Sequence, residues 1–290
     1  MRQSRTRPIC SGWFSPKHAR SDKMQGVIAA VPTPIDADGT PIKELFVVHC
    51  SWALAHGCDA LNILGSTGEA NSFDTAQRRA VMAWAAENPP KDRLMVGTGT
   101  PSLHETIALT KHADDLGYGV ALVLPPYCYK PLTDEGLTDW FMALHAALGA
   151  RDIQICFYNF PQMTGIKDSS GDLDYCRSIV AANPALSVFP SSETALATAH
   201  QDGFVGCISA SVNISAPLAG AIWAHRKTPP ADLCSEIARK RGLIAGPRLI
   251  ANVKSLVADR TQDARWRAVL PPFRTLPGAA RRDLRAAVEG

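Results

Sequence analysis

The chain has 290 residues, of which 46% are hydrophobic and 20% are charged, and its mean hydropathy is −0.04. This length suits one large barrel or two ordinary domains, and the composition is that of a globular protein rather than a disordered or membrane-embedded one. The sequence contains no run of 18 apolar residues, so we expect no membrane span.

The net charge of +3 is unevenly distributed. Residues 1–23 carry six Lys or Arg and one acid, which gives them +5 and leaves −2 for the rest of the chain. A slightly acidic body without a basic face argues against a nucleic-acid partner. We expect residues 1–23 to be a disordered basic extension or the result of a start assigned upstream of Met24; a transit peptide is a third reading.

From Gly26 onward, short apolar runs alternate with amphipathic segments, which is the sequence form of repeated βα units. The pattern predicts strands over 26–34, 59–65, 93–99, 119–127, 153–160, 166–167, 186–192 and 205–211. It predicts helices over 42–57, 75–90, 104–117, 133–149, 172–184 and 193–203, followed by helices with proline breaks to the end of the chain.

These elements predict an α/β fold, a (β/α)8 TIM barrel over 24–215 with a C-terminal helical appendage over 216–290. A doubly wound sheet is the alternative, but the glycine-rich loops that such folds use for nucleotides are missing from the sequence. Only eight residues separate Tyr158 from Lys167, whereas a parallel crossover needs about a dozen. We therefore expect helix five and part of strand six to be missing, and the flanks of strands five and six to be exposed.

The cysteines and histidines do not form metal-binding patterns. Eight cysteines show no CxxC spacing, and eight histidines show no HxxxH pair. This predicts reduced thiols in a cytoplasmic protein, with no metal and no cofactor.

In a barrel of this kind the active site lies where the strands end. Lys167 ends the predicted sixth strand and follows an apolar residue, so it could attack a carbonyl group to form a Schiff base. Tyr158 ends the preceding strand, and its phenol could transfer the protons. A surface lysine and a tyrosine that caps the core are the alternative readings of these two positions.

The segment GSTGE, residues 65–69, is a tight turn after the second strand. Gly65 allows a close backbone approach, and the hydroxyls of Ser66 and Thr67 with free backbone N–H groups would form a cradle for a carboxylate. The alternative is a polar turn that caps the following helix.

Five motifs in order, GSTGE, PPYCYKP, YNFPQMTG, IKDSSGDL and GCISASVN, resemble the dihydrodipicolinate synthase and N-acetylneuraminate lyase family over most of 24–288. The resemblance implies a homotetrameric lyase or aldolase that binds pyruvate or another 2-oxo acid as a Schiff base. It implies that Lys167 is the Schiff-base lysine, that Tyr158 is the proton donor and acceptor, and that Ser66 belongs to the proton relay. It also implies that Thr67 binds the carboxylate and that the carbonyl of Ile208 contacts the oxo acid.

Three departures qualify the resemblance. Cys128 stands where the family commonly has a relay tyrosine, so we expect a relay that is either weakened or re-routed through Tyr129. Gln162 and Met163 stand where synthases have an arginine. The second substrate is then another aldehyde or a sugar acid rather than aspartate semialdehyde. The third departure is the short connection before Lys167, which makes a catalytically impaired relative the alternative; a metal- or phosphate-dependent barrel aldolase is a further one.

Overall fold

The computed structural model describes residues 24–87, 91–128, 131–157 and 165–290. Within these residues, one sheet contains eight parallel strands in the order β7-β6-β5-β4-β3-β2-β1-β8. The strands are β1 Gly26–Ala30, β2 Ala60–Ile63, β3 Leu94–Gly97, β4 Val120–Val123, β5 Gln154–Phe157, β6 Gly165–Asp168, β7 Ser187–Pro190 and β8 Gly206–Ser209. The N–H of Val205 donates to the carbonyl of Val188 at 3.2 Å between β7 and β8, so the sheet is a nearly closed barrel.

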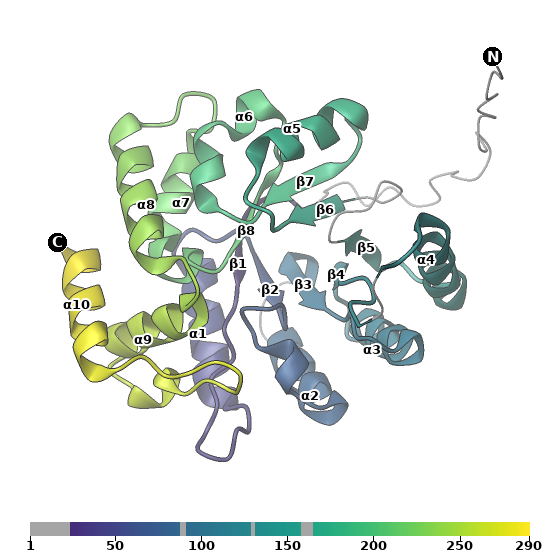
Figure 1. Ribbon diagram of the computed structural model, residues 1–290, viewed down its shortest axis with the longest axis horizontal. Coiled ribbons are helices and arrows are strands. Elements are labelled where there is room, and N and C mark those ends of the chain that lie inside the picture. Colours follow the sequence, from purple (N-terminus) through teal and green to yellow (C-terminus); the bar gives the residue numbers. More distant parts are fainter. Residues whose placement is uncertain (1–23, 88–90, 129–130, 158–164) are drawn as a thin grey trace.

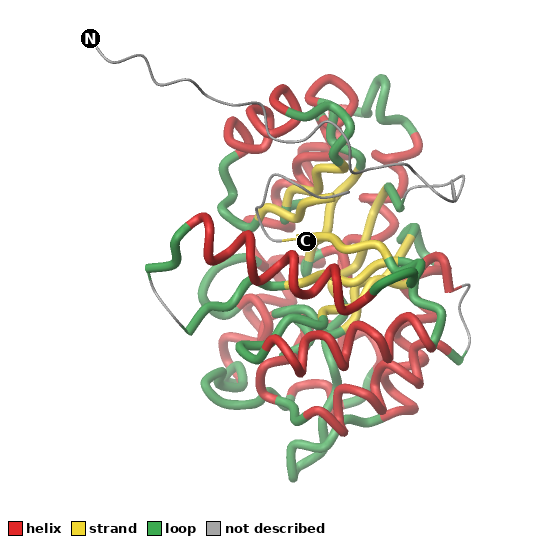
Figure 2. The backbone as a smooth tube through the Cα atoms, turned by 90° about the vertical axis from the view of Figure 1, so that its right-hand side faces the viewer, coloured by secondary structure: helices red, strands yellow, loops and turns green. Residues whose placement is uncertain are grey.

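Helices surround the strands (Figure 1), as the predicted TIM barrel requires. They are α1 Lys43–Ala55, α2 Thr75–Ala86, α3 Leu103–Asp115, α4 Asp134–Leu148, α5 Leu173–Ala182, α6 Ala199–Asp202 and α7 Val212–Ala224, followed by α8 Ala231–Ile244, α9 Leu249–Thr261 and α10 Gly278–Glu289. Figure 2 shows the strands enclosed by helices from a second direction. None of the helices in the described ranges is both long and apolar enough to cross a bilayer.

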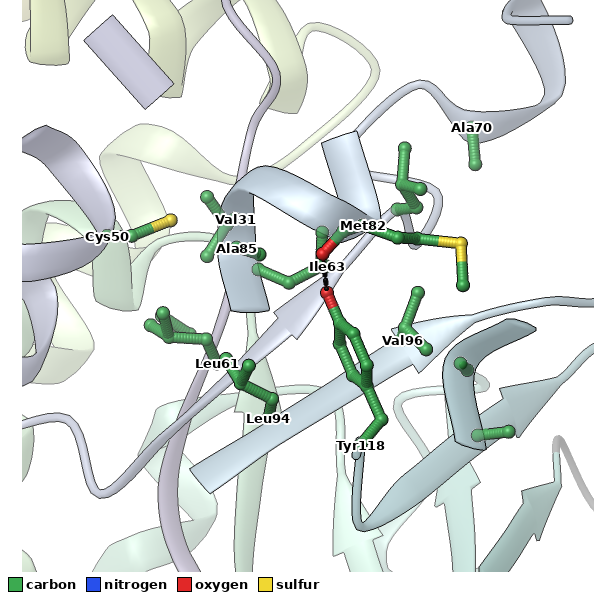
Figure 3. Packing of buried hydrophobic residues seen from close by; sticks show 14 of the residues in the cluster. Val31, Cys50, Leu61, Ile63, Ala70, Met82, Ala85, Leu94, Val96 and Tyr118 are labelled. Atoms are coloured by element: carbon green, nitrogen blue, oxygen red, sulfur yellow. Dashed lines mark hydrogen bonds between the residues drawn. The ribbon is translucent and has the colours of Figure 1, made fainter. Parts of the chain in front are cut away.

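Side-chain alternation along the strands divides the core into an outer and an inner layer. Leu61, Ile63, Leu94 and Val96 point outward and pack around Tyr118 and α2 (Figure 3), where the Tyr118 hydroxyl donates to the carbonyl of Met82 at 2.8 Å. The alternate residues form a separate apolar cluster inside the barrel, with members Ile28, Ala30, Ala60, Met95, Val120, Leu122, Cys156, Phe189 and Ile208. The inward positions therefore come from every second residue of each strand.

Polar residues cap the starts of α2, α3, α4 and α5. Asp74 and Gln77 form a capping box at α2, and Ser102, Thr133 and Asp172 accept backbone N–H groups at the starts of α3, α4 and α5. These caps satisfy donors that would otherwise lack partners at the helix ends.

The predicted helix over 193–203 is wrong. The structure has a 3-10 helix over Glu193–Ala197 and one short helical turn, α6, separated by Thr198 at φ −120° and ψ 3°. The buried carboxylate of Glu193 accepts hydrogen bonds from Ser209, Ser211 and Ser215, which tie this first turn to the following strand and helix.

The connection between β5 and β6 comprises residues 158–164, which lie outside the described residues. The described residues on either side are strands, so β6 follows β5 without room for a crossover helix. The expected loss of part of strand six is wrong, since β6 has four residues, as β5 does, and pairs with both neighbours.

The expected exposure of strands five and six is also wrong for their described residues. Phe157 and Ile166, the outward residues beside the short connection, are buried. Phe157 lies against Phe141 of α4, with 3.9 Å between ring centroids, and Ile166 packs with residues of α5 and β7. α4 thus covers the outer side of β5, and α5 covers that of β6.

The chain after β8 continues directly into helix. α7 contains Pro217 and bends at Ser215, and it packs against β1. The division between barrel and appendage proposed at 215/216 falls inside this helix and remains a prediction. The seven cysteines of the described residues are free thiols.

Candidate active site

The GSTGE turn lies at the carboxyl end of β2. The N–H of Gly68 donates to the carbonyl of Gly65 at 3.0 Å, and that of Glu69 donates to the carbonyl of Ser66 at 3.1 Å. Leu64 and Glu69, which flank the turn, have φ of 54° and 55°, a left-handed conformation that a tight reversal requires. The turn therefore has a defined backbone conformation that its own hydrogen bonds hold.

The turn carries unused donors, and its Ser66 lines a hollow at the end of the barrel. In the described part of the chain, neither the backbone N–H nor the hydroxyl of Ser66 and Thr67 has a hydrogen-bond partner. Ser66 is exposed and Thr67 is 8% exposed. The hollow is lined by Leu64, Gly65, Ser66, Ala70, Asn71, Gly97, Gly99, Leu122 and Leu124. Adjacent free N–H groups with two hydroxyls can bind a small anion such as a carboxylate.

Buried hydrogen bonds and an ion pair connect the GSTGE turn to other parts of the chain. The hydroxyl of Thr33 on the chain after β1 donates to the carbonyl of Gly68 at 2.9 Å. The carboxylate of Glu69 accepts from Lys254 Nζ on α9 at 2.5 Å and from the N–H of Leu270 at 2.6 Å. Burial lowers the pKa of Lys254, and the charge of Glu69 opposes this effect. Sequence analysis missed this pair because its members lie 185 positions apart.

Lys167 is the third residue of β6 and is 6% exposed. Its neighbour Ile166 points outward into the cluster between the sheet and α5, so alternation directs Lys167 into the barrel. Cys156 lies beside it on β5, where burial raises the pKa of the thiol to about 12, opposed by the Lys167 charge and backbone N–H. The predicted nucleophile thus lies within the barrel rather than on the surface.

The strand register shows which inward residues share a level with Lys167. Leu122 of β4 pairs with Cys156 of β5, which pairs with Gly165 of β6. The next inward residue of β6 after Gly165 is Lys167. The same step of two residues leads from Ile208 to Asn62 and from Asn62 to Leu122. In a TIM barrel, inward residues of alternate strands form layers of four. Asn62, Leu122, Lys167 and Ile208 are such a layer, with Asn62 opposite Lys167.

Some of the other residues predicted for the site lie near Lys167, and two fall outside the described residues. Gly65, Ser66 and Thr67 lie together in the turn, and Ile208 lies buried in the Lys167 layer. Tyr158 and Tyr129 fall outside the described residues. Tyr127, beside Cys128, is half-buried, which raises the pKa of its phenol. The structure therefore brings the turn, Ile208 and Lys167 to one end of the barrel.

A second polar network joins the ends of β7 and β8. The buried carboxylate of Glu193 accepts from Ser209 at 2.5 Å and from Ser211 at 2.9 Å, and Arg241 of α8 donates to both serines. The network lies outside the barrel and fixes the strand that carries Ile208. In the sequence Glu193 is only the first residue of the predicted helix over 193–203, and its contacts could not be read from spacing.

Sequence analysis also missed Asn62. Its amide is fully buried and has no hydrogen-bond partner among the residues that the structure describes. The available signal was a single polar residue in the strand ALNI at an inward position. The described ranges contain no group of three or more His, Cys, Asp or Glu side chains that could hold a metal ion.

The model of the dihydrodipicolinate synthetase family matches residues 23–166 and 153–241. A 4-hydroxy-tetrahydrodipicolinate synthase of Rhodospirillum centenum is 32% identical over 246 residues, which cover 76% of this chain and 80% of that one. An uncharacterized DapA-like lyase of Chloroflexus aurantiacus is 30% identical over 69% of this chain and 74% of its own length. The crystal structure of YagE from Escherichia coli K12, in complex with pyruvate, superposes with a TM-score of 0.79 at 22% identity, covering 91% of this chain and 97% of that one.

Proposed function

This chain belongs to the dihydrodipicolinate synthetase family, whose members include lyases, and we propose that it is itself a lyase or aldolase that binds a 2-oxo acid as a Schiff base on Lys167. The observation that carries the proposal is the inward, buried position of Lys167 in the layer next to a turn with free N–H and hydroxyl donors. Pyruvate, which the YagE structure contains, is the simplest such acid.

In the proposed reaction, Lys167 Nζ attacks the carbonyl carbon of the oxo acid, and the carbinolamine loses water to give an iminium ion. Loss of a proton from the adjacent carbon gives an enamine, which adds to an aldehyde; the reverse sequence cleaves the product. Tyr158 transfers the protons, in a relay with Ser66 and with Tyr129 in place of Cys128. These steps require a carbonyl with a hydrogen-bearing carbon beside it, and the turn would anchor the carboxylate of a 2-oxo acid.

The carboxylate of the oxo acid would bind at the turn, with Gly65 allowing close approach and Thr67 donating from its N–H and hydroxyl. The carbonyl of Ile208 would contact the bound acid from the eighth strand. We propose an aldehyde or sugar acid other than aspartate semialdehyde as the second substrate, because Gln162 and Met163 replace the arginine expected of synthases.

Borohydride trapping tests this proposal. The protein is incubated with pyruvate, reduced, digested and mapped by mass spectrometry. We expect one adduct on Lys167 that is lost in Lys167→Arg, with folding of the variant checked by circular dichroism. Lys254 is an internal control, since its amine is buried against Glu69 and should remain unmodified.

The alternatives predict different results. A folded protein without any adduct would support the catalytically impaired reading, and an activity abolished by a chelator would support the metal-dependent aldolase.

We also propose a cytoplasmic homotetramer, as the family resemblance implies; sedimentation of a monomer at micromolar concentration would contradict the tetramer.

A further inference from the structure

Asn62 is a buried polar side chain without a structural role. It is fully buried, and within the described ranges neither Nδ2 nor Oδ1 has a hydrogen-bond partner. A buried amide without partners destabilises a fold by about 1–3 kcal/mol, so nearly all such groups in native proteins are satisfied. An apolar residue of the same size would stabilise the ligand-free barrel, so the partner of Asn62 is to be sought outside the described residues, in a bound ligand.

The surroundings of Asn62 exclude most internal partners. In its layer, Leu122 and Ile208 are apolar, and Lys167 lies on the opposite strand. Its register neighbours on β1 and β3 are Ala30 and Met95. The interior of an eight-stranded barrel is wide enough for side chains or one small ligand. A ligand attached to Lys167 would therefore extend toward Asn62.

The amide lies against the base of the GSTGE turn. A Cβ atom on Gly65 would lie 2.8 Å from Asn62 Nδ2, so the missing side chain at Gly65 leaves the space that the amide occupies. The free N–H groups of Ser66 and Thr67 follow directly in the chain. Three donors thus come from one short segment, β2 and its turn, and adjacent donors of this kind suit an anion, with Asn62 Oδ1 as an unpartnered acceptor beside them.

We propose that Asn62 Nδ2 donates a hydrogen bond to the carboxylate of the 2-oxo acid bound at Lys167, as a binding residue additional to the turn. This inference rests on the proposed function. It makes Asn62 a determinant of substrate class, because a carbonyl compound without a carboxylate gains nothing from the amide.

The test uses Asn62→Leu, which has a similar shape and no polar atoms. The measured quantity is the pyruvate concentration that gives half-maximal borohydride trapping at Lys167. Hydrogen bonds to charged groups are typically worth enough to predict an increase on the order of 10- to 100-fold. Thermal unfolding of the ligand-free variant should occur at the wild-type temperature or above, since an unpartnered amide has been removed.

Hydroxyacetone, which has the carbonyl but no carboxylate, separates recognition of the carboxylate from placement of the lysine. Its trapping by Asn62→Leu should match the wild type. If trapping of both compounds falls by the same factor, or if the half-maximal pyruvate concentration does not change, this inference is wrong while the proposed function stands. If the wild type is not labelled at any pyruvate concentration, both fail.

Discussion

Lys254 Nζ lies 2.5 Å from Glu69 Oε1, and both side chains are completely shielded from solvent. Lys254 belongs to α9, beyond the barrel, whereas Glu69 ends the GSTGE turn. The ion pair therefore couples the C-terminal helices to the candidate carboxylate site. Breaking a buried ion pair leaves an uncompensated charge, which is costly in a medium that solvates it poorly.

We expect Lys254→Met to lower the free energy of unfolding by about 3–5 kcal/mol, because Glu69 would remain buried without its cation. Urea unfolding followed by circular dichroism measures this change. The double variant Glu69→Gln/Lys254→Met removes both charges and should regain part of the loss. A single variant within 1 kcal/mol of the wild type would contradict the expected coupling.

Stability should depend on pH through His49. Arg260 donates to His49 Nδ1 at 2.7 Å, so Nε2 carries the hydrogen and donates to Asn213 Oδ1 at 2.8 Å. Burial, with the nearby Arg260 charge, lowers the pKa of His49 from 6.5 to about 3. Between these values the unfolded chain binds a proton that the folded protein excludes, so the free energy of unfolding falls as pH falls, by up to about 1.4 kcal/mol per pH unit from this group.

The contribution of His49 to the pH dependence is the difference between the unfolding free energies of the wild type and His49→Asn. Urea unfolding at intervals from pH 4 to pH 7 should show a steeper loss toward acid for the wild type. Parallel stability curves for the two proteins would show that His49 titrates equally in the folded and unfolded states.

Phe141 should be essential for covering β5. It is 4% exposed and packs against Phe157, whereas its neighbour Met142 on the same helix is 51% exposed. Phe141→Ala should lower the unfolding free energy by about 3–5 kcal/mol, and Met142→Ala should change it by less than about 0.5 kcal/mol. Comparable effects of the two variants in chemical denaturation would show that α4 does not protect the strand.

Gly97 allows the close approach of β3 to the end of β2. A Cβ atom at this position would lie 2.1 Å from the carbonyl oxygen of Leu64, a backbone atom that cannot move without displacing the turn. Gly97→Ala should destabilise the protein by at least about 1–3 kcal/mol and weaken pyruvate trapping. Gly242 is the matched control, because an added Cβ there meets nothing within 4 Å, and Gly242→Ala in α8 should stabilise by about 0.5–1 kcal/mol. Equal melting temperatures for the two variants would refute the steric explanation.

Much of the barrel could be predicted because its units are local. Each βα repeat combines a short apolar run with a helix of 3.6-residue periodicity, and both signals lie within about fifteen residues. The prediction over 193–203 failed because Glu193 bonds to serines of the next strand and helix, a contact that periodicity does not contain. The expected exposure beside β6 failed because Phe141 and the α5 cluster cover it from neighbouring units.

The sequence by itself determined the repeated strand and helix pattern, the family motifs, and Lys167 and residues 65–67 as site candidates, because each depends on residues close together in the chain. Only the tertiary structure decided what surrounds them. Closure of the barrel set the stagger that places Asn62 opposite Lys167, and folding of the C-terminal helices brought Lys254 to Glu69. Such relationships depend on strand register and side-chain burial, which arise when distant segments pack together.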